Sequence, residues 1–112
     1  MSLVLQVAAD FLADQDCQVV WYVEHAGEDV ANRYLEAIQR TVAQLCRTPT
    51  LGAICQFKHP RLIGLRFCRM SRPYQKHVIF YRHNETTLFA ERVIHGARDL
   101  PRRLLEPPGT QS

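Results

Sequence analysis

The chain has 112 residues, of which 46% are hydrophobic and 22% charged, and this composition fits a single globular domain with one apolar core. It contains no run of about 18 apolar residues, which excludes a membrane-spanning helix. The N-terminal segment MSLVLQVAADF is too short and too acidic in its flank for a signal peptide, so we expect a cytoplasmic protein.

The net charge of +3 hides an asymmetry between the two halves. Residues 1–57 carry three basic and seven acidic side chains, a balance of −4, whereas residues 58–112 carry eleven basic and four acidic ones, a balance of +7. A half this basic favours an anionic partner, such as a nucleic acid, a nucleoprotein machine or an acidic protein segment. A solvated basic surface without a partner is the alternative.

The cysteines form no CxxC pair, and none lies at metal-ligand spacing from a histidine. We therefore expect free, mostly buried thiols, with no metal and no cofactor. The residues are Cys17, Cys46, Cys55 and Cys68.

The N-terminal half predicts a strand followed by a helical hairpin. Residues 3–7 (LVLQV) favour a strand, and Asp10 is expected to cap a helix that ends near His25, although residues 19–23 include β-forming types. Gly27 supplies a turn. A clearer helix follows over residues 28–47, with acidic residues in its first turn and Arg47 in its last. So short a connection predicts antiparallel packing.

The C-terminal half changes to an extended pattern. Residues 65–70, 77–82 and 88–94 read as strands, and the short turns between them require antiparallel hairpins. We expect an α+β fold in which the helical hairpin packs on one face of a small antiparallel sheet. A short helix over residues 98–105 completes a single domain of residues 1–106, and residues 107–112 are expected to fray. Residues 50–63 remain unassigned.

Alternation along HVIFYR places residues 77, 79 and 81 on one face of the sheet and residues 78, 80 and 82 on the other. Basic and aromatic side chains therefore recur on one face or along the rim of the sheet. That combination suits phosphate binding and base stacking, and an ordinary solvated face is the alternative.

A metal-free ribonuclease would need a base, an acid and cations around the scissile phosphate. Residue types suited to those roles are present, but no serine elbow, glycine-rich phosphate loop or carboxylate pair stands out. Glu91 is better explained as the partner of a neighbouring arginine. The eligible residues are Lys58, Arg66, Lys76, His77, His95 and Arg98.

The segment RVIHGARDL, residues 92–100, is the most distinctive in the chain. Gly96 directly follows a strand and suits a left-handed turn that reverses the chain. Arg98 and Asp99 can pair locally or with His95, in which case the segment locks the end of the sheet and has no active site.

Along the chain, a strand is followed by a helical hairpin containing AGEDVANRYLEAI, a loop with PTLG, and then GLR, HVIFYR and RVIHGARDL. This order of motifs resembles the RelE/ParE toxin superfamily, in its ParE branch, over roughly residues 3–105. The resemblance implies the toxin of a toxin–antitoxin pair. Its partner would be a cognate antitoxin whose C-terminal segment wraps the toxin in a hetero-oligomer. ParE-like proteins poison DNA gyrase by blocking religation of cleaved DNA.

RelE-like relatives instead cut mRNA in the ribosomal A site. That branch tends to have an arginine three residues before the strand tyrosine, where this chain has Val78, and a catalytic tyrosine near the end, where it has Leu104 and Leu105. The resemblance therefore favours a gyrase-binding toxin. A ribosome-dependent endoribonuclease using Lys58, Lys76, His77, His95 and Arg98 is the alternative, and a member that only binds its antitoxin is a third possibility.

Target contact is expected from the basic half and the sheet. An antitoxin tail is expected to lay apolar side chains beside the helical hairpin or to add a strand to the sheet edge, with its acidic residues meeting the basic half. The candidate target-binding residues are Arg66, His77, Tyr81, Arg92, His95, Arg98, Arg102 and Arg103.

Overall fold

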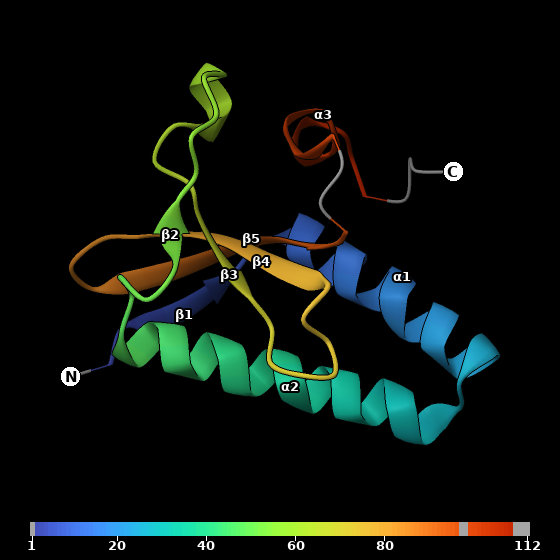
Figure 1. Ribbon diagram of the computed structural model, residues 1–112. Helices are drawn as coiled ribbons and strands as arrows, with labels where there is room; N and C mark the ends of the chain where they lie inside the picture. Colours follow the sequence, from blue (N-terminus) through green and yellow to red (C-terminus); the bar gives the residue numbers. More distant parts are fainter. Residues whose placement is uncertain (1, 97–98, 109–112) are drawn as a thin grey trace.

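The computed structural model of the protein describes residues 2–96 and 99–108 (Figure 1). In this part of the chain an N-terminal strand precedes two long helices, and the remaining strands and a short helix follow. The elements are β1 (Val4–Val7), α1 (Ala9–His25), α2 (Glu28–Arg47), β2 (Ala53–Ile54), the 3-10 turn η1 (Pro60–Leu62), β3 (Arg66–Arg69), β4 (His77–His83), β5 (Thr87–His95) and α3 (Leu100–Leu105).

The strands of the described residues form one five-stranded sheet in the order β1-β5-β4-β3-β2. The expected antiparallel meander is present from β3 to β5, and β2 extends it by a short edge strand. β1 joins the other edge in parallel, from Val4 beside Thr87 to Val7 beside Ala90, so the sheet is mixed. Parallel pairing is possible because a long connection separates β1 from β5.

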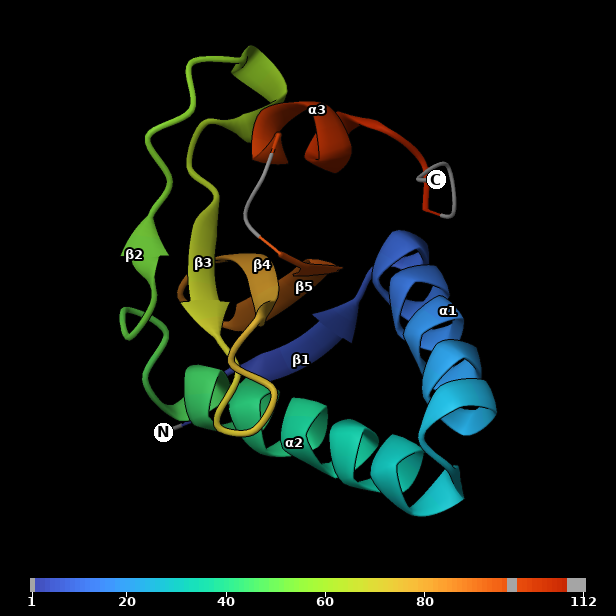
Figure 2. The ribbon, with the colours of Figure 1, turned by 45° about the vertical axis from the view of Figure 1, so that its right-hand side comes forward.

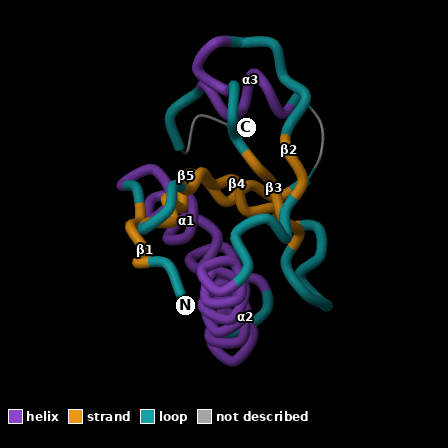
Figure 3. Tube along the Cα trace, turned by 90° about the vertical axis from the view of Figure 1, so that its left-hand side faces the viewer, coloured by secondary structure: helices purple, strands orange, loops and turns teal. Residues whose placement is uncertain are grey.

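The helical hairpin covers one face of the sheet, as expected for this α+β fold (Figure 3). α2 turns a continuous apolar stripe inward, which includes the fully buried Tyr34 and Leu45. These side chains pack with Ile79, Tyr81 and Leu88 of the central strands. Among the described residues, no helix is both apolar enough and long enough to cross a membrane.

α1 is a helix, but its start differs from expectation. It begins at Ala9 with Ala8 as the N-cap, so the prediction that Asp10 caps it was wrong. The reason is that the Ala8 amide still bonds to the Ala90 carbonyl at 2.9 Å, which leaves no free turn before the helix. Phe11 is buried, whereas large apolar residues that recur at helical spacing along this segment are exposed. They are Leu12, Val20, Trp21 and Val23.

A second apolar cluster covers the opposite face of the sheet, beneath α3 and η1 (Figure 2). α3 begins at Leu100; the expected start of this helix at Arg98, and residues 109–112 of the tail, lie outside the described residues. The buried residues of this cluster are Cys55, Leu62, Leu65, Val78, Phe80, Ile94 and Leu104. The sheet is therefore buried on both faces.

The loop between α2 and β2 is held by Tyr81. Its hydroxyl donates to the Pro49 carbonyl at 2.6 Å and accepts from the Gly52 amide at 3.0 Å. A Cβ at Gly52 would lie 2.5 Å from both that hydroxyl and the Phe67 carbonyl, so only glycine fits. Tyr81 thus fixes where the chain enters the sheet.

Candidate functional site

Three basic side chains gather where β4 begins and β5 ends, beside α3. His95 is the last residue of β5 and is exposed, and Lys76 directly precedes β4. Gly96 adopts the left-handed turn expected for it, with φ of 91°, and donates to the Lys76 carbonyl at 2.8 Å. The Arg103 guanidinium folds back from α3 and donates to the His95 carbonyl. We call this group of Lys76, His95 and Arg103 the basic end.

The basic end keeps its histidine uncharged at neutral pH. Burial lowers the pKa of His95, and the positive charges of Lys76 and Arg103 lower it further. The surroundings of the imidazole therefore disfavour its protonated form. A shallow hollow of about 290 Å³ opens beside it, between α1 and β5. Its lining residues include Asp14, Cys17, Trp21, His95 and Arg103.

His77 does not belong to this surface. It lies directly opposite His95 in the β4–β5 register, with the ring centres 4.8 Å apart, but it is only 2% exposed. Its Nε2 is 2.9 Å from the Tyr22 hydroxyl. Burial, and then His95, lower the pKa of His77 to about 4. A side chain enclosed in this way holds the helices to the sheet and cannot touch a macromolecule, which corrects its place among the candidates.

Tyr81 and Arg92 need the same correction. Tyr81 is fully buried and bonded to the loop before β2. Arg92 is 6% exposed. It lies opposite Phe80, next to an irregularity in the β4–β5 register that leaves Glu91 without a strand partner. Glu91 instead pairs with Arg82 at 2.6 Å, which confirms the arginine partner expected for it.

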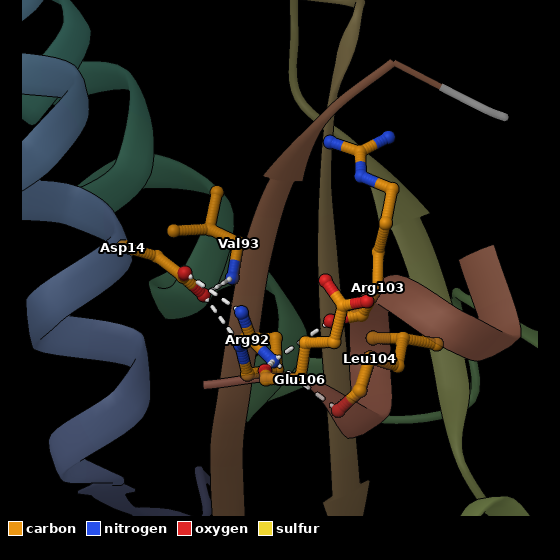
Figure 4. Close-up of polar contacts among 6 residues, drawn as sticks. All are labelled: Asp14, Arg92, Val93, Arg103, Leu104 and Glu106. Carbon is orange, nitrogen blue, oxygen red and sulfur yellow. Dashed lines mark hydrogen bonds and ion pairs between the residues drawn. The ribbon is translucent and has the colours of Figure 1, made fainter. Parts of the chain in front are cut away.

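The Arg92 guanidinium ties α1, β5 and α3 together (Figure 4). Its Nε and Nη2 donate to the two carboxylate oxygens of Asp14 at 2.7 and 3.0 Å, and Asp14 also accepts the Val93 amide at 3.1 Å. Nη1 donates to the carbonyls of Arg103, Leu104 and Glu106 at the end of α3. Although burial lowers the pKa of Arg92, the bond to Asp14 and its charge leave that pKa raised.

The remaining candidates are spread over the molecule. Arg66 pairs with Tyr81 in the strand register, about 13 Å along β4 from His77, and donates to the Gly52 carbonyl at 2.7 Å. Lys58 is exposed between β2 and η1. Arg102 is exposed on α3 and pairs with Asp99 and Glu106. Arg98 lies outside the described residues.

Among the described candidates, the basic end can therefore contact a ligand through its cationic side chains and its imidazole. Of the residues suggested for a ribonuclease, Lys76 and His95 belong to the basic end, Lys58 is exposed between β2 and η1, and His77 is enclosed. Within the described residues, no group of three histidine, cysteine or acidic side chains is placed to hold a metal ion. The cysteines are free, with Cys46 and Cys55 buried and Cys17 exposed.

Comparison with known proteins identifies the family. Residues 5–100 match the family model described as the ParE toxin of the type II toxin–antitoxin system parDE. A solved structure described as the chromosomal ParDE toxin–antitoxin system from P. aeruginosa superposes with a TM-score of 0.69 at 20% identity, covering 86% of this chain and 98% of that one. No curated protein sequence matches. The protein belongs to the ParE toxin family of type II toxin–antitoxin systems.

Proposed function

We propose that this protein is a toxin that inhibits DNA gyrase by binding it, and that a cognate antitoxin neutralises it. The family match over residues 5–100 supports membership of a toxin–antitoxin system, and the ParE resemblance of HVIFYR and RVIHGARDL supports gyrase as the target. Gyrase acts on DNA in the cytoplasm, so the proposal places the toxin there.

The observation that carries this choice over a ribonuclease is the environment of Val78. This position, where the ribonuclease branch tends to have an arginine, is 5% exposed and packs with Phe80 and Leu104. A cation there would be buried among apolar side chains at a cost of several kcal/mol. The sheet face beneath α3 is therefore packed with apolar side chains, and position 78 carries no catalytic cation. This supports a protein that acts by binding its target.

The basic end and Arg102 form the proposed contact surface for the gyrase–DNA complex. His95, Lys76 and Arg102 are exposed, and Arg103 is partly exposed beside them. Positive charge at this place favours approach to a nucleoprotein through long-range attraction. Arg98 lies between His95 and Arg102 in the sequence, and we include it in the proposed surface for that reason.

The outward side of α1 is the proposed antitoxin surface. Trp21 is 50% exposed and Val20 56%, an apolar exposure that a soluble chain usually covers with a partner. Leu12 and Val23 are exposed on the same helix. Around the helix axis Leu12 and Val23 lie on one side of Val20 and Trp21 lies on the other, so an amphipathic helix of an antitoxin that packs across Val20 can bury one of these flanks against its own apolar face.

Induced expression in a bacterial host tests the choice of target. A gyrase poison induces a DNA-damage reporter before translation slows, and co-expression of the antitoxin restores growth. Codon-phased cuts in ribosome-bound mRNA, lost in the His95→Ala/Arg98→Ala variant, would support the ribonuclease instead. Growth that is unaffected by the free protein, despite tight antitoxin binding, would support a member that only binds its antitoxin.

A further inference from the structure

An apolar pocket of about 320 Å³ lies between the sheet and the start of α3. Figure 2 shows the chain rising from β2 beside β3, with α3 at the same end of the sheet. Phe67 of β3 and Phe80 of β4 line the pocket from the sheet, Phe57 lines it from the segment after β2, and Leu100 lines it from α3. We call it the phenylalanine pocket.

The strand register turns one cation toward this pocket. Phe67 pairs with Phe80, and both side chains stand on the face of the sheet that packs beneath α3. Arg69 is two residues further along β3, so its side chain stands on the same face. It pairs with Val78, which is buried in the same apolar cluster. The Arg69 side chain therefore lines the phenylalanine pocket.

The Arg69 guanidinium is available to a ligand. Arg69 is exposed, and no side-chain hydrogen bond or ion pair joins it to another residue of segments 2–96 and 99–108. None of the described residues that line the pocket is acidic. Asp99, which precedes Leu100, pairs with Arg102 instead. An unpaired cation beside an apolar pocket favours an anion that has an apolar body of its own.

The size of the pocket favours a small molecule. Ligand pockets span about 300–1,000 Å³, so a volume of 320 Å³ lies at the lower end of that range. One turn of a partner helix, about 10 Å across and 5 Å long, would need more space. The three phenylalanine rings suit an aromatic body, because aromatic pairs gain free energy from edge-to-face contacts.

We propose that the phenylalanine pocket binds a small aromatic carboxylate, whose ring lies among Phe57, Phe67 and Phe80 and whose carboxylate pairs with Arg69. A planar guanidinium presents parallel N–H donors that match the two oxygens of a carboxylate. Burial of the ring stabilises the complex, and the charge pair fixes its orientation. Cys55 also lines the pocket, and burial raises the pKa of its thiol, so at neutral pH it stays uncharged and does not repel the anion.

The same pocket suits a nucleotide less well. One guanidinium balances the single charge of a carboxylate, whereas a phosphate monoester carries nearly two negative charges at neutral pH. Apart from Arg69, the polar side chains among the described lining residues are the amide of Gln56 and the thiol of Cys55. The polar edge of a nucleobase would therefore be buried with too few partners.

Leu100 connects the pocket to α3, the helix that carries Arg102 of the proposed target surface. A ligand that contacts Leu100 would hold the first turn of α3 against the sheet. In that turn the Arg103 amide donates to the Asp99 carbonyl at 2.9 Å. Exchange of the Arg103 amide with deuterium should therefore slow when the pocket is filled.

An NMR titration of the isotope-labelled full chain with naphthoate, an aromatic carboxylate, tests the proposal. We expect saturable shifts of the Phe67, Arg69 and Val78 amide signals, with a dissociation constant on the order of 100 μM. Arg69→Gln removes the charge and keeps a polar side chain, so it should weaken binding about tenfold. The matched control, Arg40→Gln, makes the same change at an exposed arginine of α2 and should leave the affinity within about twofold.

A ligand series separates the charge from the apolar body. The uncharged amide of naphthoate should bind the wild-type protein about tenfold more weakly than naphthoate, and should bind Arg69→Gln as well as it binds the wild type. Benzoate has a smaller ring and should bind several-fold more weakly than naphthoate. Acetate should cause no saturable shift.

Four results would each overturn the proposal. They are equal naphthoate affinity in Arg69→Gln and the wild type, equal wild-type affinity for naphthoate and its amide, largest shifts at the exposed Trp21 of α1, and unchanged exchange of the Arg103 amide at saturating naphthoate. The measurements need no gyrase and no antitoxin. Failure of the proposed target would therefore leave this site standing, and absence of naphthoate binding would leave the target standing.

Discussion

Arg92 on β5 and Asp14 on α1 meet 78 residues apart in the chain, with Arg92 Nε 2.7 Å from Asp14 Oδ2 and each side chain less than 10% exposed. β1 ends beside Ala90, so the outer edge of β5 lacks a strand partner beyond it. Asp14 takes that place by accepting the Val93 amide, and Arg92 carries the connection on to α3. One ion pair therefore completes the sheet edge and holds the C-terminal helix.

Removing this pair should be costly. Arg92→Met leaves the Asp14 carboxylate and the α3 carbonyls without their donor, so we expect the free energy of unfolding to fall by about 3 kcal/mol in urea titrations. Asp14→Leu together with Arg92→Met should lose less than the two single changes summed, because no charge is then buried alone. Arg102→Met, which removes two exposed ion pairs, is the control and should leave the urea midpoint unchanged. A midpoint for Arg92→Met equal to that of the control would contradict the assignment.

The enclosed His77 makes stability fall in acid. Its pKa is about 4 in the folded protein against an ordinary value of 6.5, so the unfolded chain binds the proton first. The contribution is complete above about pH 6.5 and is lost as the pH falls toward 4, up to roughly 3 kcal/mol. His77→Phe keeps the ring contacts and should flatten the dependence of unfolding free energy on pH between 7 and 4.5. His83→Gln, on the rim of the sheet, should retain the wild-type slope; equal slopes in all three proteins would exclude His77 as the cause.

The loop before β2 should depend on one glycine and one hydroxyl. Gly52→Ala places a methyl group 2.5 Å from the Phe67 carbonyl and the Tyr81 hydroxyl, so the loop must move, with an expected loss of about 2–3 kcal/mol. Tyr81→Phe removes two hydrogen bonds at the same place and should lose about 1–2 kcal/mol. Thr50→Ala, on the exposed part of the loop, serves as the control in thermal unfolding. A melting temperature of Gly52→Ala within a degree or so of the control would show that the loop accommodates the side chain.

The exposed side of α1 should matter for partner binding and not for folding. Val20→Glu/Trp21→Glu replaces half-exposed apolar side chains, so the urea midpoint should change little while affinity for the antitoxin encoded by the adjoining gene falls about 100-fold or more. Calorimetric titration measures this. Gln39→Glu, an exposed change on α2, is the control. Unchanged antitoxin affinity in the α1 variant would show that the antitoxin binds another face of the toxin.

Much of the fold could be predicted because its signals are local. The apolar stripe of α2 and the side-chain alternation of β4 each lie within a single element. Gly96 directly follows a strand, and a glycine in that place is itself a local signal for a turn. β2 was not predicted, since two residues carry no period and its pairing depends on distant β3. The inward face of α1 was not predicted, because Phe11, Asp14 and Tyr22 turn inward while the equally apolar Val20 and Trp21 remain outside.

The candidate site was predicted less well, since charge along the chain does not report burial. The segment RVIHGARDL suggested that Arg92 is a surface cation. Only the position of Asp14 on α1 shows that the Arg92 guanidinium forms a buried ion pair. The aromatic spacing of Phe11 and Tyr22 on one helical stripe was a signal for that inward face.

DNA cleavage with purified gyrase shows whether the protein is a gyrase poison. The protein is mixed with gyrase, ATP and supercoiled plasmid, and cleaved complexes are trapped with detergent. We expect linear DNA to accumulate with toxin concentration and antitoxin to abolish it. Arg102→Glu should weaken the accumulation several-fold, whereas Arg61→Glu should not. Normal supercoiling without linear DNA at saturating toxin, together with codon-phased cutting of ribosome-bound mRNA, would contradict gyrase poisoning.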